Sequence, residues 1–198
     1  MNAVRACLVG FCCALMLAAS AQDSRAQSIW SVVAGPTFGT ISSDQFSDAS
    51  YTTGFFAGVG RATELSDRWS VTPYVAYVQK GADFNGEIAS YDYIEIPVFF
   101  TAAFPLDGGK AFTASVGPQF GFQINCDEDG TDCSDFADAS SIEAGVVGGL
   151  GLAIPHGDDG SFSFGVAADW GITDLFDTLD FKTRTYYLFA RYAKTIGG

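Results

Sequence analysis

The sequence predicts an all-β fold, an eight-stranded antiparallel up-and-down transmembrane β-barrel. Three observations lead to this prediction. Apolar residues alternate with small or polar residues along most of the chain, which is typical of strands that have two different faces. The spacers between these segments are alternately short and long, as in an outer-membrane meander. The chain also begins with the features of a secretory signal peptide.

The N-terminal segment has the charge, apolar run and small residues of an export signal. Arg5 supplies the positive charge, residues 8–19 are apolar, and Ala19-Ser20-Ala21 forms an A-x-A cleavage site. Cleavage is expected after Ala21, and cleavage after Ala26 is the alternative. The expected division of the chain is a signal peptide at 1–21, a short lead at 22–27 and an outer-membrane β-barrel domain at 28–198.

Eight segments show the alternation expected of strands. Residues 111–125 show it best, because the even positions are apolar whereas the odd positions are small or polar. In chain order, the expected strands are 29–40, 51–64, 69–80, 92–104, 111–125, 141–154, 161–173 and 183–194. The first two and the last fit more loosely. Strands of about ten residues suit a tilted crossing of the hydrocarbon layer, and no apolar run of helix-spanning length lies outside the signal.

The spacers fall into two groups. Tight turns are expected at 65–68, 105–110 and 155–160, and longer, mostly polar loops at 41–50, 81–91, 126–140 and 174–182. Outer-membrane barrels place short turns in the periplasm and long loops outside the cell. We therefore expect both termini in the periplasm and residues 126–140 on the cell surface.

The two faces of the strands assign side chains to lipid or lumen. The apolar face carries aromatic residues near both strand ends, as interfacial girdles do. At the turn ends these are Trp30, Trp69, Phe104, Phe112, Phe162 and Tyr192, and nearer the loop ends Phe38, Tyr77, Phe122, Trp170 and Tyr186. The polar residues expected in the lumen are Lys80, Glu95, Gln119, Gln123, Glu143, Asp169 and Arg191. Bulky lumen residues such as Tyr74, Phe99 and Tyr187 favour a filled interior over an open channel.

The segment YIEIPVFF at 93–100 places a charge and a proline inside a strand. Glu95 has lumen parity, so the carboxylate can find a partner there, for which Lys80 and the more distant Arg191 are candidates. Pro97 cannot donate a ladder hydrogen bond and a closed barrel has no edge strand. A bulge or a missed ladder bond is therefore expected at Pro97.

The chain resembles the PorT-like outer-membrane β-barrel proteins. The segments that carry the resemblance, in the order found in that family, are GFFAGVG (54–60), LSDRWSVTPYVAYVQKGA (65–82), YDYIEIPVFF (91–100), ASVGPQFGF (114–122) and FSFGVAADWGITDLF (162–176). Many outer-membrane chains end in an aromatic residue, whereas this one continues past Tyr192 as AKTIGG. The resemblance implies an eight-stranded barrel in the bacterial outer membrane, inserted by the barrel assembly machinery. It does not imply one activity.

Several functions remain open. We expect a non-enzymatic, monomeric barrel with structural, adhesion or surface-binding roles, and no cofactor. The sole histidine, His156, lies in a tight turn, and no strand pairs it with a serine on a shared face. The alternatives are a secretion-associated PorT-like component, a narrow porin-like pore, a lipid-modifying enzyme, and a soluble binding barrel with its apolar face inside.

The two cysteines outside the signal are expected to form a disulfide. Cys126 and Cys133 are close in sequence in an exported chain. In the same stretch, Asn125, Asp127 and Asp129 match the first offsets of a calcium loop, but Phe136 stands where that loop has glutamate. An acidic surface loop is therefore the preferred interpretation, with no metal.

The negative net charge limits the classes of molecule that the chain is expected to bind. The full chain has a net charge of −13, and removal of Arg5 with the signal makes it more acidic. This argues against nucleic acid and against attachment to anionic lipid by charge alone. The expected partners are outer-membrane lipid around the barrel and an unknown extracellular or envelope ligand.

Overall fold

The computed structural model describes residues 28–43, 50–84, 87–128, 131–132, 142–173 and 181–196. Its elements are β1 (Ser28–Ser43), β2 (Ser50–Ser66), β3 (Trp69–Phe84), β4 (Glu87–Pro105), the 3-10 turn η1 (Asp107–Gly109), β5 (Ala111–Glu128), β6 (Thr131–Asp132), β7 (Ile142–His156), β8 (Gly160–Gly171) and β9 (Phe181–Ile196). Within this part of the chain no helix is long and apolar enough to cross a membrane.

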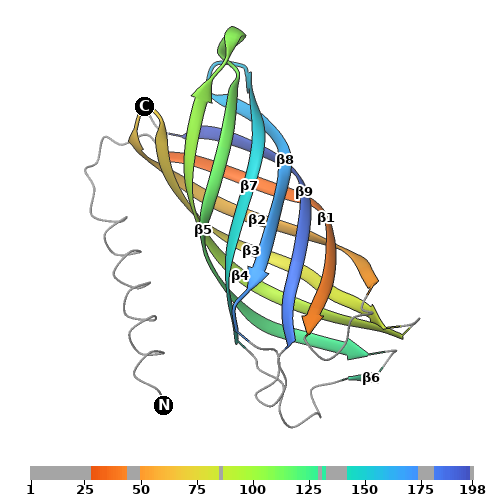
Figure 1. Cartoon of the computed structure of the whole chain (residues 1–198). Coiled ribbons are helices and arrows are strands. Elements are labelled where there is room, and N and C mark those ends of the chain that lie inside the picture. Colours follow the sequence, from red (N-terminus) through yellow and green to blue (C-terminus); the bar gives the residue numbers. More distant parts are fainter. Residues whose placement is uncertain are drawn as a thin grey trace, which may run out of the picture.

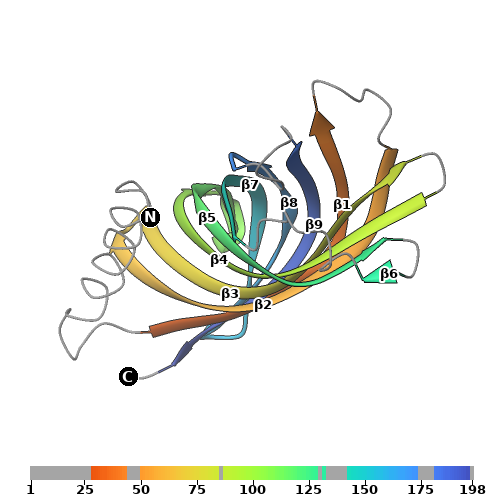
Figure 2. The ribbon, with the colours of Figure 1, turned by 90° about the horizontal axis from the view of Figure 1, so that it is seen from below.

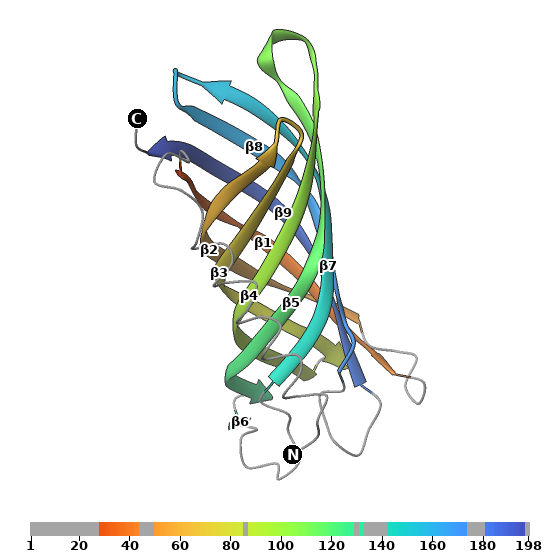
Figure 3. The ribbon, with the colours of Figure 1, turned by 90° about the vertical axis from the view of Figure 1, so that its left-hand side faces the viewer.

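Eight long strands close into a barrel (Figures 1 and 2). Each strand pairs antiparallel with its neighbours, β1 joins β9, and β4 joins β5, so the sheet returns on itself. The strands are strongly tilted, and Figure 3 shows the β4–β5 hairpin projecting beyond the others. The prediction of an eight-stranded antiparallel barrel is confirmed. We call the end with the β2–β3, β4–β5 and β7–β8 hairpins the turn end and the opposite end the loop end.

The strands are longer than the sequence predicts, at 12 to 19 residues. The expected loop at 81–91 is wrong: β3 runs to Phe84 and β4 begins at Glu87. Ala82 and Ala89 are opposite each other in the ladder, and both are buried. The segment is therefore held by strand pairing and by packing of small residues, neither of which produces an alternating apolar pattern.

The other expected loops are also shorter. Strand β1 continues to Ser43 and β9 begins at Phe181. Strand β5 continues to Glu128 and pairs with β6, so a short hairpin occupies part of the expected 126–140 loop. The rest of that loop lies outside the described residues, as do 44–49 and 174–180.

The in-strand prolines interrupt the ladder without a bulge. Strands β4 and β5 pair at Pro97–Gln119 and next at Phe100–Val116, with the same register on both sides of the gap. Of the two expected solutions, the structure adopts missed ladder pairs. The gap contains Gly117, whose missing side chain lets the carbonyl of Val98 come close.

The outer surface is apolar and aromatic. Fully outward residues at the turn end include Trp30, Trp69 and Phe104, with about half of each side chain exposed, and Trp170 and Phe122 take the same role at the loop end. Rings meet across strands in both zones, for example Phe104 with Phe112 and Phe55 with Tyr77. The apolar exterior is therefore suited to lipid, whereas Lys80, Glu95, Glu143 and Asp169 are buried inside the barrel.

Candidate functional site

Four inward-facing charged residues meet inside the loop-side half of the barrel. Lys80 comes from β3, Glu95 from β4, Glu143 from β7 and Asp169 from β8. Each lies on the strand face opposite the apolar, lipid-facing residues, and all four are almost completely buried. We call these four residues the ionic layer.

The Lys80 ammonium is the centre of the ionic layer. Its Nζ lies 2.7 Å from Glu95 Oε1, 2.7 Å from Glu143 Oε1 and 2.6 Å from Asp169 Oδ2. It donates hydrogen bonds to Glu143 and Asp169, whereas the contact with Glu95 is an ion pair without hydrogen-bond alignment. One cation thus connects four strands across the lumen.

Neutral groups complete this layer. Thr183 donates a hydrogen bond to Glu143 Oε1 at 2.9 Å, and the Tyr93 ring lies 5.3 Å from Lys80 Nζ. The outer oxygens Glu143 Oε2 and Asp169 Oδ1 are buried and have no hydrogen-bond partner. Three carboxylates surround a single ammonium, so the ionic layer is rich in acceptors and depends on Lys80.

Apolar layers enclose the ionic layer on both sides. Toward the loop end lies a buried cluster of Ile41, Ala82, Ala89, Tyr91, Tyr93 and Cys126. Toward the turn end lies a second cluster of Phe56, Ala76, Val78 and Tyr187, supported by Val33, Ala167 and Phe189. Side chains therefore fill the middle of the barrel rather than lining an open channel.

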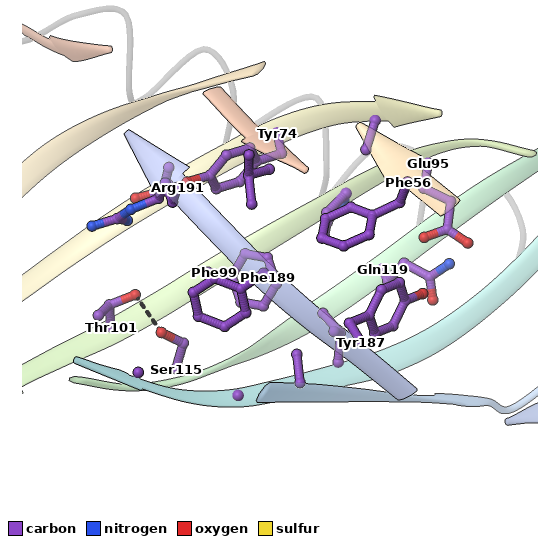
Figure 4. Close-up of a pocket in the computed structure, with 18 of the residues that line it drawn as sticks. Phe56, Tyr74, Glu95, Phe99, Thr101, Ser115, Gln119, Tyr187, Phe189 and Arg191 are labelled. Atoms are coloured by element: carbon purple, nitrogen blue, oxygen red, sulfur yellow. Dashed lines mark hydrogen bonds between the residues drawn. The ribbon is translucent and has the colours of Figure 1, made fainter. Parts of the chain in front are cut away.

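A cavity of about 110 Å³ lies in the lumen on the turn side of the ionic layer (Figure 4). Phe99 and Phe189 lie in the middle of this view, and Glu95 and Gln119 lie toward one side. Arg191 and Tyr74 lie toward the other side. Thr101 and Ser115 share a 2.9 Å hydrogen bond at the wall, and Tyr74 shares one with Ser31, also at 2.9 Å.

Two polar side chains of the cavity have unused hydrogen-bonding capacity. Gln119 is 1% exposed, and neither atom of its amide has a partner. Arg191 is partly exposed, its Nε is buried without a partner, and its Nη2 reaches only Ser163 Oγ at 3.4 Å. All ion pairs found among the described lumen residues belong to Lys80 instead.

The remaining expected site residues lie apart from these groups. Gln123 is half-buried and is the direct ladder partner of Tyr93 in the β4–β5 pair. Cys126 is buried and disulfide-bonded, and its expected partner Cys133 lies outside the described residues.

The expected lumen parity of Asn125 is wrong. Strand β5 bulges between Gln123 and Asn125, so Asn125 is exposed and donates a 3.2 Å hydrogen bond to Asp92. Asn125 and Asp127 both lie on an extended strand rather than in a calcium loop. Asp129 lies outside the described residues.

Several contributors were missed from the sequence. Thr183 of β9 and the Tyr93 ring contact the ionic layer directly, and Thr101 and Ser115 form part of the cavity wall. Tyr93 and Thr101 share the parity of Glu95, so the alternation that places Glu95 in the lumen could also have placed them there. Their depth in the barrel depends on register between strands, which that pattern does not contain.

Comparisons with known proteins agree with this architecture. Residues 20–177 match the outer membrane protein beta-barrel domain family. No curated protein matches the sequence. Among solved structures, Neisserial surface protein A aligns with a TM-score of 0.59 and 12% identity, covering 84% of this chain and 97% of that chain. The outer membrane protein OprG from Pseudomonas aeruginosa aligns with a TM-score of 0.52 and 12% identity, covering 87% and 98%. At these identities the likeness shows the fold alone.

Proposed function

We propose that this chain, which belongs to the outer membrane protein beta-barrel domain family of the bacterial outer membrane, is a closed, non-enzymatic barrel that acts through its extracellular loops. The observation that carries the proposal is the ionic layer, which crosses the lumen and is packed on both sides by apolar side chains. A barrel of eight strands has an interior that side chains can fill.

The environment of the histidine supports a non-enzymatic role. His156 lies at the β7–β8 hairpin, where its ring contacts Phe162 and Tyr192. It is exposed and packs on the outer aromatic surface, far along β7 from Glu143. A histidine-activated nucleophile needs its partner within hydrogen-bond reach, and among the described residues no hydroxyl partner for His156 is found.

The loop segments provide the chemistry for surface binding. The sequences of 44–49, 127–141 and 174–180 contain aspartate or glutamate and no lysine or arginine. A ligand with positive charge fits such loops best, and its binding should weaken with added salt because exposed charges are screened.

We expect the purified barrel to conduct no ions. Reconstituted in planar bilayers, it should give no stable conductance steps, because the filled lumen leaves no continuous water path. A sixteen-stranded porin, whose barrel leaves an aqueous channel, is the positive control. Regular steps from the wild-type protein would contradict a closed barrel and favour the narrow pore.

A secretion-associated role is the alternative supported by the PorT-like segments. Both proposals include export of the chain through a cleaved signal peptide. Both roles need the long loops outside the cell. An epitope tag inserted at Gly130 should be labelled by antibody on intact cells. A tag in the turn at Gly108 is the matched control and should be labelled only after lysis, and the reverse pattern would show the opposite orientation.

A further inference from the structure

The lumen cavity is lined by a charged side chain, that of Arg191, which forms no ion pair with an acidic residue of the described chain. Arg191 lines the cavity, its Nε is buried without a partner, and its one hydrogen bond is the 3.4 Å contact with Ser163. A guanidinium remains charged at every physiological pH. Unpaired donors on a charged group are unfavourable where water is scarce, so this end of the cavity favours an anion.

The groups around Arg191 suit a carboxylate. A guanidinium presents a planar set of donors that a carboxylate accepts through two parallel hydrogen bonds. Tyr74, Thr101, Thr113 and Ser115 line the same cavity and offer hydroxyl groups. Part of the Arg191 side chain remains exposed, whereas its Nε is buried.

The walls are apolar and set the size of the ligand. Val33, Phe56, Phe99 and Phe189 line the cavity. Figure 4 shows the three phenylalanine rings between Arg191 and Glu95. The cavity measures about 110 Å³, close to the roughly 150 Å³ of an apolar cavity that binds benzene. A single ring or a short hydrocarbon chain therefore fills it.

The far end of the cavity limits the ligand to one negative charge. Glu95 and Gln119 line that end, and Glu95 belongs to a layer with three carboxylates for one ammonium. A second carboxylate there would meet like charge in a region of low dielectric. A hydroxyl or amide at that end would instead find the unused amide of Gln119.

We propose that this cavity binds a small apolar monocarboxylate, with its carboxylate on Arg191 and its hydrocarbon part between Phe99 and Phe189. The site goes beyond the proposed surface function and does not depend on it, because Arg191, Phe99 and Phe189 line a cavity in the lumen, away from the extracellular loops. The ionic layer closes the inner end, so the cavity is a binding site without a through path.

Four probes of similar size separate charge from shape. Benzoate, benzyl alcohol, benzylamine and terephthalate are titrated calorimetrically into the full barrel in nanodiscs of zwitterionic lipid, with empty nanodiscs subtracted. Benzoate should bind about tenfold or more tightly than the alcohol, because a charge-assisted hydrogen-bond pair is the difference between them. Benzylamine and terephthalate should bind more weakly than benzoate.

Two arginine variants test the assignment. Arg191→Gln should weaken benzoate binding about tenfold or more and leave benzyl alcohol unchanged. Arg184→Gln, which changes an exposed arginine on the same strand, should leave both unchanged. Heat-modifiable migration on a detergent gel confirms that each variant is folded. Two results would overturn the proposal. One is equal binding of benzoate by folded wild type and folded Arg191→Gln. The other is no detectable binding to wild type at a benzoate concentration 10-fold above a dissociation constant of about 1 mM.

Discussion

Replacing Lys80 with methionine is expected to prevent stable folding of the barrel. Methionine replaces the apolar stem of the lysine side chain but removes the ammonium that contacts Glu95, Glu143 and Asp169. Removal of one member of a buried ion pair typically costs about 3–5 kcal/mol, because the remaining charge is left unpaired. Here three carboxylates lose their cation together, so the loss should reach at least that range.

Urea unfolding in lipid vesicles, followed by heat-modifiable migration, measures this effect. Glu95→Gln is the matched control, because it leaves Lys80 with two carboxylates and replaces the contact that lacks hydrogen-bond alignment. We expect Glu95→Gln to change the free energy of unfolding far less than Lys80→Met does.

A rescue variant keeps this prediction testable if Lys80→Met does not fold at all. Combining Lys80→Met with Glu95→Gln, Glu143→Gln and Asp169→Asn removes every charge of the ionic layer while preserving side-chain shape. If unpaired charge is the cause, the neutral combination should fold. If the neutral combination also fails to fold, unpaired charge is not the cause of the loss, and shape or hydrogen bonding decides stability at this layer.

The closed barrel could be predicted from the sequence because its two faces have different solvents. One face of each strand meets lipid and the other meets a packed, partly polar lumen, so apolar and polar residues alternate with a period of two. This alternation is visible in a single sequence without any contact information. The same reasoning placed Lys80, Glu95, Glu143 and Asp169 on the lumen face. It could not show that they meet at one point, since Lys80 and Asp169 lie 89 residues apart and meet only through the register of the whole barrel.

The errors have a common physical origin. Ala82 and Ala89 pair across the β3–β4 hairpin and are buried, and small residues of this kind give no periodic signal, so the sequence pattern predicts a loop around them. Asn125 changed faces because of one bulge in β5, and one extra residue reverses the side-chain parity beyond it. Both features depend on residues distant in sequence, because Ala82 and Ala89 belong to a buried cluster with Ile41 and Cys126, and the bulge is set by pairing of Asn125 with Asp92.

Replacing Gly117 with alanine is expected to disrupt the barrel although it adds a single methyl group. A Cβ at Gly117 would overlap the carbonyl oxygen of Val98 and would also lie 2.8 Å from its carbonyl carbon and 3.3 Å from Phe99 Cα. These are backbone atoms of the neighbouring strand, which cannot rotate away as a side chain can. The strands would have to separate where Pro97 and Pro118 already interrupt the ladder.

The expected loss for Gly117→Ala is about 3 kcal/mol, at the upper end of the cost of overpacking. Gly148→Ala on β7 is the control, because the nearest atom to its added Cβ is Ser115 O at 3.5 Å, an ordinary contact. That variant should be as stable as the wild type or slightly more stable. Alanine lowers the conformational entropy of the unfolded chain, which raises the free energy of unfolding by about 0.4–1 kcal/mol. Urea unfolding of both variants in the same vesicles gives the comparison. Equal stability of Gly117→Ala and Gly148→Ala would mean that the β4–β5 ladder can open at the prolines without cost.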